Sequence, residues 1–191
     1  MASALLLLDL DGTVWDSHPL YASVLAPESG LTEAAIIEQL RTGRNVIEMA
    51  RRFLGAGETF ARRCHGILHT LRLYEGVAST LEILAAADTR LGVITNLPGY
   101  LVKPILIDLE LVEYFDVLKF AAGKPSGRAI ASSIQHSQVN PDSIWYVGDT
   151  SSDLLAARSA GISFAWAEWG YASKFPGADR TLRAFPEVLQ L

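Results

Sequence analysis

The sequence has little of what marks a secreted, membrane-bound or nucleic-acid-binding protein. Its one cysteine, Cys64, cannot form an internal disulfide. No apolar run approaches the ~20 residues of a membrane-spanning helix, and no basic segment precedes the short leucine run near the start. Sixteen basic against 21 acidic residues give a net charge of −5, the wrong sign for gripping nucleic acid or anionic lipid. We therefore expect a cytoplasmic protein with no nucleic acid and no membrane as partner.

Apolar residues, by contrast, are plentiful. Half of the 191 residues are hydrophobic and 19% are charged, which is enough to bury a substantial core. The length fits one domain, or one domain with an insertion. Disordered, collagen-like and coiled-coil chains are excluded by this composition.

Short apolar runs recur along the chain, and most of them end in a polar turn followed by a helical pattern. A continuous apolar run is typical of a strand buried on both faces, and the alternation of strand and helix predicts an α/β fold with a parallel sheet. Helical patterns between the runs predict the crossover helices. We expect the strands at residues 4–8, 91–94, 117–120, 144–147 and 162–166.

Residues 16–74 differ from the rest of the chain. They contain no strand-like run, and their apolar residues recur at helical spacing. Thr32 has the sequence environment of a helix N-cap. This segment therefore predicts an all-helical insertion between the first strand and the remainder of the sheet.

Polar clusters follow the predicted strands. Singly, each cluster has an ordinary explanation as a turn, a strand end or a helix cap. All of them, however, fall near the C-terminal ends of parallel strands, which is the edge where open α/β sheets bind ligands. This edge gathers four carboxylates, a hydroxyl and an ammonium, on Asp9, Asp11, Asp149, Asp153, Thr95 and Lys124.

Carboxylates gathered in this way repel one another, by about 4 kcal/mol for a pair roughly 4 Å apart at an effective dielectric constant near ~20. A bound cation would remove this repulsion, and oxygen-only ligands suit the hard ion Mg²⁺. Lys124 adds a positive charge and Thr95 a hydrogen-bond donor. The residues together predict a site for a phosphoryl group in an in-line transition state.

Four ordered motifs carry a family resemblance. In this order, after hydrophobic strands, they resemble the motifs of the haloacid dehalogenase superfamily. The helical insertion after the first motif is similar to the cap of the subgroup that includes phosphoglycolate phosphatase and β-phosphoglucomutase. The motifs, which span nearly the whole chain, are Asp9-Leu10-Asp11-Gly12-Thr13, Thr95-Asn96, Lys124-Pro125 and Gly148-Asp149-Thr150-Ser151-Ser152-Asp153.

The resemblance implies a Rossmann-like, doubly wound parallel sheet of strand order 3-2-1-4-5 with an inserted all-helical cap. It divides the chain into a catalytic core of residues 1–15 and 76–191 and a cap of residues 16–75. The adjacency of the first and fourth strands in this order also follows from the chemistry, because Asp9 and Asp149 must share one metal ion.

The resemblance also implies roles for the carboxylates. Asp9 is the expected nucleophile, which forms an aspartyl-phosphate. Asp11 is the expected general acid, which protonates the leaving oxygen and then activates water as a base. The expected Mg²⁺ ligands are Asp9, the main-chain carbonyl of Asp11 and Asp149, with Asp153 behind them or bound through water.

The remaining polar residues are expected to bind the substrate. Thr95 and the backbone of Asn96 should hold the phosphoryl oxygens, and Lys124 should neutralise charge on the nucleophile and the phosphate. Arg41 and Arg44 lie at a predicted turn between cap helices, the part of such caps that reaches toward the substrate. The alternative interpretation is that both arginines belong to a solvated helix face.

The leading hypothesis is a Mg²⁺-dependent phosphatase that acts on a small-molecule phosphomonoester. A phosphomutase of the β-phosphoglucomutase type would keep every residue but return the phosphoryl group to the substrate. A dehalogenase is disfavoured because Asp11 has no comparable task in halide displacement, and a non-catalytic phosphate-binding regulator because no catalytic position is missing. Leu97 and Glu75 stand where relatives often carry Lys and Pro, so the identity of the substrate stays open. The oligomeric state is open as well.

Overall fold

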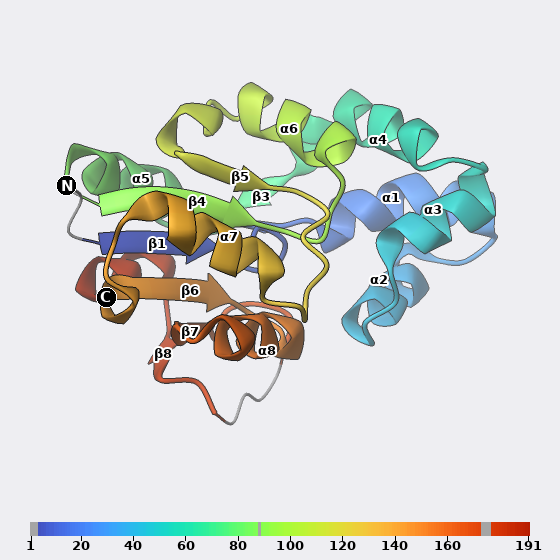
Figure 1. The fold of residues 1–191 in the computed structure, drawn as a ribbon. Coiled ribbons are helices and arrows are strands. Elements are labelled where there is room, and N and C mark those ends of the chain that lie inside the picture. Colours follow the sequence, from blue (N-terminus) through green and yellow to red (C-terminus); the bar gives the residue numbers. More distant parts are fainter. Residues whose placement is uncertain (1–3, 88, 173–176) are drawn as a thin grey trace.

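A computed structural model describes residues 4–87, 89–172 and 177–191. The chain forms a six-stranded parallel sheet flanked by helices, and four further helices stand together at one end of it (Figure 1). None of the described helices is both long and apolar enough to cross a lipid bilayer.

The sheet has the strand order β5-β4-β1-β6-β7-β8, and every neighbouring pair is parallel. The predicted order 3-2-1-4-5 is confirmed in its first five positions, and β8 adds an edge strand. The strands are β1 (Ala4–Leu8), β4 (Thr89–Ile94), β5 (Val117–Lys119), β6 (Ile144–Gly148), β7 (Ser163–Ala167) and β8 (Arg180–Leu182).

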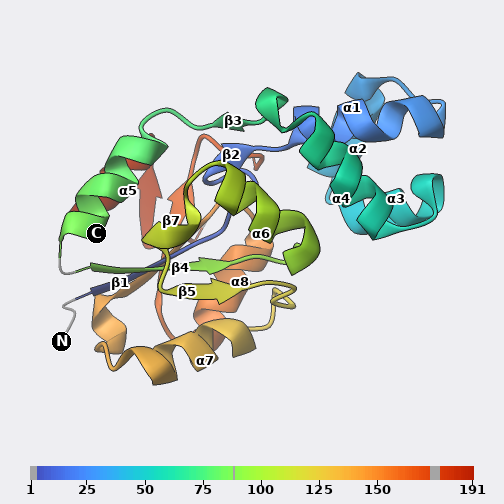
Figure 2. The ribbon, with the colours of Figure 1, turned by 90° about the horizontal axis from the view of Figure 1, so that it is seen from above.

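The central strand β1 is apolar along its length because helices cover both faces of the sheet. Leu6 and Leu8 point into one hydrophobic cluster, and Leu5 and Leu7 point into the other. Figure 2 shows α5 and α6 on one side of the sheet and α7 on the other, where α8 also packs. These helices are α5 (Val77–Ala86), α6 (Gly99–Asp108), α7 (Arg128–Ser137) and α8 (Ser151–Ala160).

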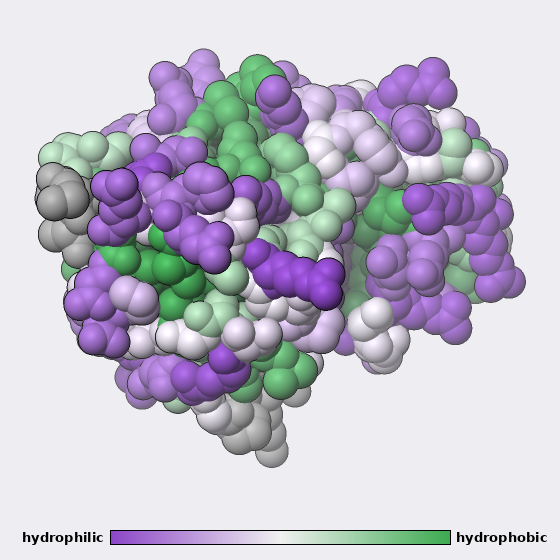
Figure 3. Space-filling view, in the orientation of Figure 1, coloured by the Kyte–Doolittle hydropathy of each residue, from purple (hydrophilic) through white to green (hydrophobic). Residues whose placement is uncertain are grey.

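The insertion folds as four helices, α1 (His18–Ser29), α2 (Glu33–Arg41), α3 (Val46–Leu54) and α4 (Gly57–Gly66). Thr32 caps α2 as predicted, since its side chain accepts a hydrogen bond of 3.2 Å from the backbone N–H of Ala35. We call these four helices the cap. In the space-filling view the visible face of the cap is largely hydrophilic, and hydrophobic atoms show between it and the sheet (Figure 3).

A two-stranded antiparallel ribbon joins the cap to the sheet. It pairs β2 (Trp15–Asp16) with β3 (Arg72–Leu73), so the chain enters and leaves the cap through adjacent strands. The expectation of an all-helical insertion misses this ribbon, because two-residue strands leave no alternating pattern to detect. The division into residues 1–15 and 76–191 against 16–75 stays a prediction, and both of its boundaries fall close to the ribbon.

Short 3₁₀ helices complete the described structure. They span Leu68–Thr70, Val112–Tyr114, Pro141–Ser143 and Phe185–Gln190. A second contact between cap and core lies at α4 and α6, where the Nε2 atom of His65 is 3.2 Å from the carbonyl oxygen of Leu101. The ribbon and this contact both link the cap to the core at the C-terminal edge of the sheet.

Candidate active site

Three buried carboxylates meet at the C-terminal edge of the sheet. Oxygen atoms of Asp9, Asp149 and Asp153 lie within 4.8 Å of one another, and the three residues are 6%, 0% and 0% exposed. Asp9 continues β1, and its backbone N–H donates a 2.9 Å hydrogen bond to the carbonyl of Val147 in β6. Asp149 directly follows β6, so the adjacency of these two strands is what brings the carboxylates together, as the sequence predicts.

Asp153 is placed by the start of α8. Its side chain accepts hydrogen bonds from the backbone N–H and the hydroxyl of Thr150, which completes a capping box at the N-terminus of this helix. One oxygen of Asp153 also lies 2.6 Å from the ammonium of Lys124. Both oxygens of the Asp153 carboxylate are therefore already bound, one by Thr150 at the N-terminus of α8 and the other by Lys124.

Lys124 is the buried cation of the site. Its Nζ atom lies 2.8 Å from Asp9 Oδ1 and 2.6 Å from Asp153 Oδ1, and its side chain is 4% exposed. The ammonium also donates to the hydroxyl of Tyr146, 3.1 Å away. Burial opposes the charge of Lys124, but the two carboxylates outweigh burial and raise its pKa. Lys124 is therefore charged and pairs with Asp9.

When all three carboxylates of the cluster are ionised, Lys124 neutralises only part of their charge. Burial raises the pKa of Asp9 to about 7, against the attraction of Lys124. Burial, and then the charges of Asp153 and Asp9, raise the pKa of Asp149 well above its usual range. For Asp153, burial acts in the same direction, but Lys124 outweighs it and lowers the pKa. One ammonium among three carboxylates leaves room for a cation.

The residues present fit Mg²⁺. Within the described part of the chain, Asp149 Oδ1 has no hydrogen-bond partner although it is buried, whereas Oδ2 accepts from the backbone N–H of Tyr171 at 2.8 Å. A buried carboxylate oxygen without a donor is costly unless a cation satisfies it. The ligand atoms are all oxygen, which is the chemistry that Mg²⁺ prefers.

Asp11 takes its hydrogen bonds from outside this cluster and lines the same pocket as Asp9. Its carboxylate accepts a 2.6 Å hydrogen bond from Trp15 Nε1, and the hydroxyl of Tyr21 lies 3.1 Å from both of its oxygens. Burial raises the pKa of Asp11, while hydrogen bonds from Trp15, Ser17 and Tyr21 act in the opposite direction. The side chain is thus held on the cap side of the nucleophile.

Thr95 and Asn96 follow β4 at the same edge of the sheet. Thr95 is buried, and its Oγ1 atom accepts from the backbone N–H of Leu97 at 3.2 Å. The side chain of Asn96 pairs with the backbone of Lys124: its Oδ1 accepts from the N–H at 2.7 Å, and its Nδ2 donates to the carbonyl at 3.2 Å. Asn96 therefore holds the loop that delivers Lys124, a contact that the sequence does not reveal.

A pocket of about 220 Å³ lies over these groups, between the core and the cap. Its floor comes from the strand ends, and its upper wall comes from α1 and from the segment that joins α2 to α3. The lining residues contributed by the cap are His18, Leu40, Arg44, Asn45, Val46 and Ile47, and those contributed by the core include Asp9, Asp11, Thr95, Lys124 and Tyr171.

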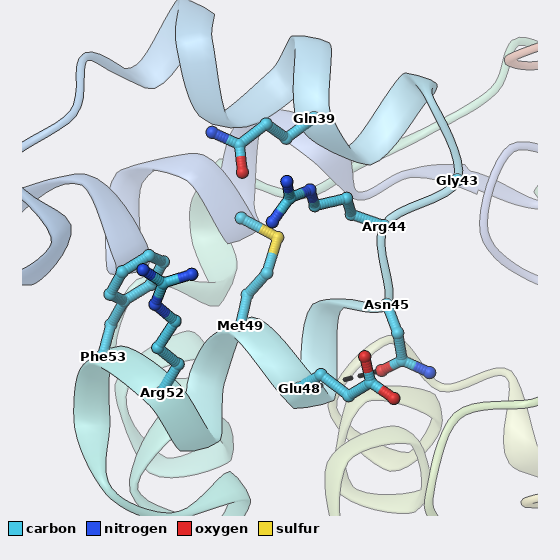
Figure 4. Close-up of a pocket in the computed structure, with 8 residues that line it drawn as sticks. All are labelled: Gln39, Gly43, Arg44, Asn45, Glu48, Met49, Arg52 and Phe53. Carbon is cyan, nitrogen blue, oxygen red and sulfur yellow. Dashed lines mark hydrogen bonds between the residues drawn. The ribbon is translucent and has the colours of Figure 1, made fainter.

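The two cap arginines fall in different places. Arg44 lines the pocket, and it also lines a hollow of about 420 Å³ inside the cap, between α2 and α3. Figure 4 shows its guanidinium turned into that hollow toward Gln39 and Met49. Arg41 lines a separate cleft of about 470 Å³ beside Tyr171. Substrate binding by either arginine stays a prediction, and Arg44 is the better placed of the two.

Several polar contacts of the site involve tyrosines for which the sequence predicted no role in the site. Tyr146 lies in β6, whose sequence is mostly apolar. Its hydroxyl is 2.9 Å from Asp153 and 3.0 Å from the carbonyl oxygen of Ile94. Tyr171 follows β7 at the same sheet edge and binds Asp149. Its position after the fifth predicted strand could have indicated a site residue, because the ends of the other strands also supply site residues.

Known proteins resemble this chain along most of its length. The model of the haloacid dehalogenase-like hydrolase family matches residues 6–167. A phosphoglycolate phosphatase of Xanthomonas campestris pv. campestris (strain 8004) is 34% identical over 184 residues, which cover 86% of this chain and 83% of that protein. Phosphoglycolate phosphatase 1 of Pseudomonas aeruginosa is 29% identical over 204 residues, which cover 92% and 73%.

Solved structures share the fold at lower identity. CbbY from Rhodobacter sphaeroides, crystallised with phosphate, has a TM-score of 0.80 at 21% identity and covers 98% of this chain and 96% of its own. A HAD-superfamily hydrolase from Geobacter sulfurreducens has a TM-score of 0.76 at 21% identity, covering 99% and 96%. With the family model matching most of its residues, this chain belongs to the haloacid dehalogenase-like hydrolases.

Proposed function

We propose that this chain is a Mg²⁺-dependent phosphatase that hydrolyses a small-molecule phosphomonoester through an aspartyl-phosphate on Asp9. The observation that carries the proposal is the pairing of Asp9 with Lys124 at 2.8 Å, beside two more buried carboxylates, on the floor of a pocket of about 220 Å³. Relatives named phosphoglycolate phosphatase support the same activity.

Asp9, Asp149 and the main-chain carbonyl of Asp11 would hold the Mg²⁺ ion, with Asp153 bound through water. When bound, the ion supplies positive charge that stabilises the phosphoryl oxygens in the transition state. The unpartnered oxygen of Asp149 supports this assignment. Asp153 fits the outer place because it is already committed to Lys124 and Thr150.

Asp9 begins the reaction as the nucleophile. One carboxylate oxygen attacks phosphorus, the bond from phosphorus to the leaving oxygen breaks, and Asp11 gives its proton to that oxygen. Lys124 neutralises charge on Asp9 and on the transferred group, and the Thr95 hydroxyl donates to a phosphoryl oxygen. Asp11 then takes a proton from a water molecule that attacks the aspartyl-phosphate, which releases phosphate and restores Asp9.

The cap side of the pocket supports a small substrate. Leu40, Val46 and Ile47 give it an apolar wall, and the polar residues Arg44 and Asn45 also line it. A leaving group of a few heavy atoms with a polar or anionic end matches this wall. Phosphoglycolate is the first compound to test, because the relatives that carry its name are similar to this chain over most of their length.

The test is a screen of phosphorylated metabolites for released phosphate, with p-nitrophenyl phosphate as a generic substrate. We expect turnover with MgCl₂, loss of turnover with EDTA, and none in Asp9→Asn, since no other group replaces the nucleophile. Product analysis with a sugar phosphate separates a mutase, which returns the phosphoryl group to the sugar. Absence of turnover on every compound, with folded protein and Mg²⁺ present, would refute the proposal.

A further inference from the structure

Two of the donors that hold the carboxylate of Asp11 are large buried side chains from the entrance to the cap, and Ser17 lies between them in the sequence. Trp15 Nε1 is 2.6 Å from Oδ1, and the Tyr21 hydroxyl is 3.1 Å from each oxygen. Trp15 belongs to β2 of the ribbon, and Tyr21 to the first turn and a half of α1. Both side chains are buried, at 0% and 1% exposure, so water does not compete for these hydrogen bonds.

Both donors are themselves fixed by the cap and its ribbon. The Tyr21 ring packs against Phe60 of α4, with ring centroids 5.4 Å apart. Trp15 pairs with Leu73 across the ribbon. Two donors from two elements define both the position and the plane of the carboxyl group, because a single donor would leave it free to rotate.

The nucleophile is held differently. Asp9 takes its position from core elements, through the 2.9 Å backbone bond to Val147 in β6 and the 2.8 Å pair with Lys124. The two carboxylates that the proposed mechanism uses therefore rest on different parts of the fold. The core at the sheet edge positions Asp9 for nucleophilic attack, whereas the cap and its ribbon supply the groups that bind Asp11, the proton donor.

Accepting the proposed function as a basis, we propose that Tyr21 and Trp15 are positioning residues that orient Asp11 toward the leaving oxygen. Neither residue touches the reacting atoms, and both act through the Asp11 carboxyl. The cap thereby does more than cover the substrate: it supplies a hydroxyl on α1, and we expect removal of that hydroxyl to weaken proton donation and to leave nucleophilic attack intact. The Tyr21 hydroxyl is the cleaner probe, because Tyr21→Phe keeps the ring that packs on Phe60.

The experiment compares phenyl phosphate with p-nitrophenyl phosphate, which have similar shapes but leaving groups of different basicity. The measured quantity is kcat/KM, which includes the departure of the leaving group. For Tyr21→Phe we expect about a tenfold loss on phenyl phosphate, which needs a proton donor, and less than about a twofold change on p-nitrophenyl phosphate, which departs without help. A merely structural defect would lower both values by the same factor.

A double-mutant cycle tests whether Tyr21 acts through Asp11. Asp11→Asn removes the acid, so adding Tyr21→Phe to it should cost nothing further on phenyl phosphate. Multiplied losses in the double variant would overturn the proposal, as would equal losses on both substrates in the single variant. Tyr114→Phe, which removes a hydroxyl on a 3₁₀ helix outside the pocket lining, is the matched control and should leave both values unchanged.

The outcomes separate this proposal from the proposed function. If the wild type hydrolyses neither aryl phosphate nor any metabolite, the phosphatase assignment fails. If the wild type is active and Tyr21→Phe retains its selectivity between the two aryl phosphates, the positioning role fails alone. Thermal unfolding checks that the variant is folded; should Tyr21→Phe not fold, Trp15→Phe removes the other donor and is expected to shift selectivity in the same direction.

Discussion

Asp149 shows how a single residue can be costly to the fold and necessary to the site. It is fully buried, one of its oxygens has no hydrogen-bond partner among the described residues, and two other carboxylates lie nearby. Such a group is stabilised by a bound cation or by a proton, and is unfavourable with neither. Natural sequences retain unfavourable groups of this kind where function requires them.

The variant Asp149→Asn tests this cost. A carboxyl whose folded-state pKa is raised contributes stability that is full below its unfolded-state pKa and is lost as the pH rises through the folded-state value. At neutral pH without metal, the uncharged amide should therefore raise Tm by several degrees, since about 1 kcal/mol corresponds to roughly 2–4 °C in a chain of this size.

Thermal unfolding with EDTA measures the effect of the substitution on Tm without metal, and thermal unfolding with MgCl₂ measures how far each protein responds to the ion. Mg²⁺ should raise Tm of the wild type by mass action and should raise Tm of the variant much less. A variant that is less stable than the wild type in EDTA, and equally responsive to Mg²⁺, would contradict both the strain and the ligand assignment.

At the scale of elements, the site depends on how closely three loops approach one another. Gly12 follows β1 and has a φ of +78°, and a Cβ atom there would collide with the Asp149 carboxylate and the Tyr171 ring. Gly170, after β7, would collide with Asp149 and with the carbonyl of Gly12. The loops after β1, β6 and β7 can close around Asp149 only because two of them offer no side chain.

Arg44, in the loop between α2 and α3, and Arg52, on α3, form a matched pair of arginines for a test of substrate recognition. Arg44 lines both the pocket and the cap hollow, whereas Arg52 lines only the hollow (Figure 4). For a substrate with a distal anionic group, Arg44→Ala should raise KM about tenfold and leave kcat within about twofold, because the lost contact is made in both ground and transition state.

Arg52→Ala is the control, since it removes a guanidinium from the same part of the cap without touching the pocket. It should leave KM unchanged on that substrate, and neither variant should alter the hydrolysis of p-nitrophenyl phosphate, which has no distal anion. Equal effects of the two arginines would show that the overall charge of the cap, rather than a contact in the pocket, is responsible.

For the whole molecule, the placement of the cap relative to the core is decided by a few contacts. Besides the ribbon and the contact of α4 with α6, the ring of His18 in α1 stacks on Tyr171 of the core, with centroids 3.5 Å apart and planes within 7°. The Tyr171 hydroxyl accepts from the backbone N–H of Ser17 at 2.9 Å and donates to Asp16 at 3.1 Å. Tyr171 thus links the loop that binds Asp149 to the start of the cap.

The His18 stack should make this interface sensitive to acid. Burial, with the nearby Arg41 as a smaller cause, lowers the pKa of His18 from 6.5 to about 4. Between these values the unfolded chain takes up a proton that the folded chain does not, so the contribution of His18 is full above pH 6.5 and is lost as the pH falls toward 4. Lowering the pH from 7 to 5 should therefore reduce the free energy of unfolding by about 1–2 kcal/mol through His18.

Urea unfolding at pH 7 and pH 5 measures this loss in the wild type and in His18→Phe, which keeps an aromatic ring in the stack. The variant should lose less stability than the wild type, and the carboxylates common to both proteins cancel in the difference. Substitution of the exposed His136 on α7 serves as the control. Identical pH dependence in wild type and His18→Phe would exclude His18 as the cause.

The sequence by itself determined the alternation of strands and helices and the gathering of carboxylates at one sheet edge, and the full strand order came from the family resemblance that its motifs carry. These features follow from local patterns: an apolar run such as Leu5 to Leu8 is typical of a strand buried on both faces, and the C-terminal ends of parallel strands share one edge. The requirement that Asp9 and Asp149 meet then made the first and fourth predicted strands neighbours.

Only the tertiary structure decided which side chains support that cluster. Tyr21 reaches Asp11 across ten positions, and Tyr171 reaches Ser17 across 154, at hydrogen-bond distances that no periodicity encodes. The same holds for the two cap arginines, which lie three residues apart in the sequence but line different hollows. The physical reason is that these contacts depend on how the packed cap sits over the sheet, whereas local pattern reports only burial and periodicity within one element.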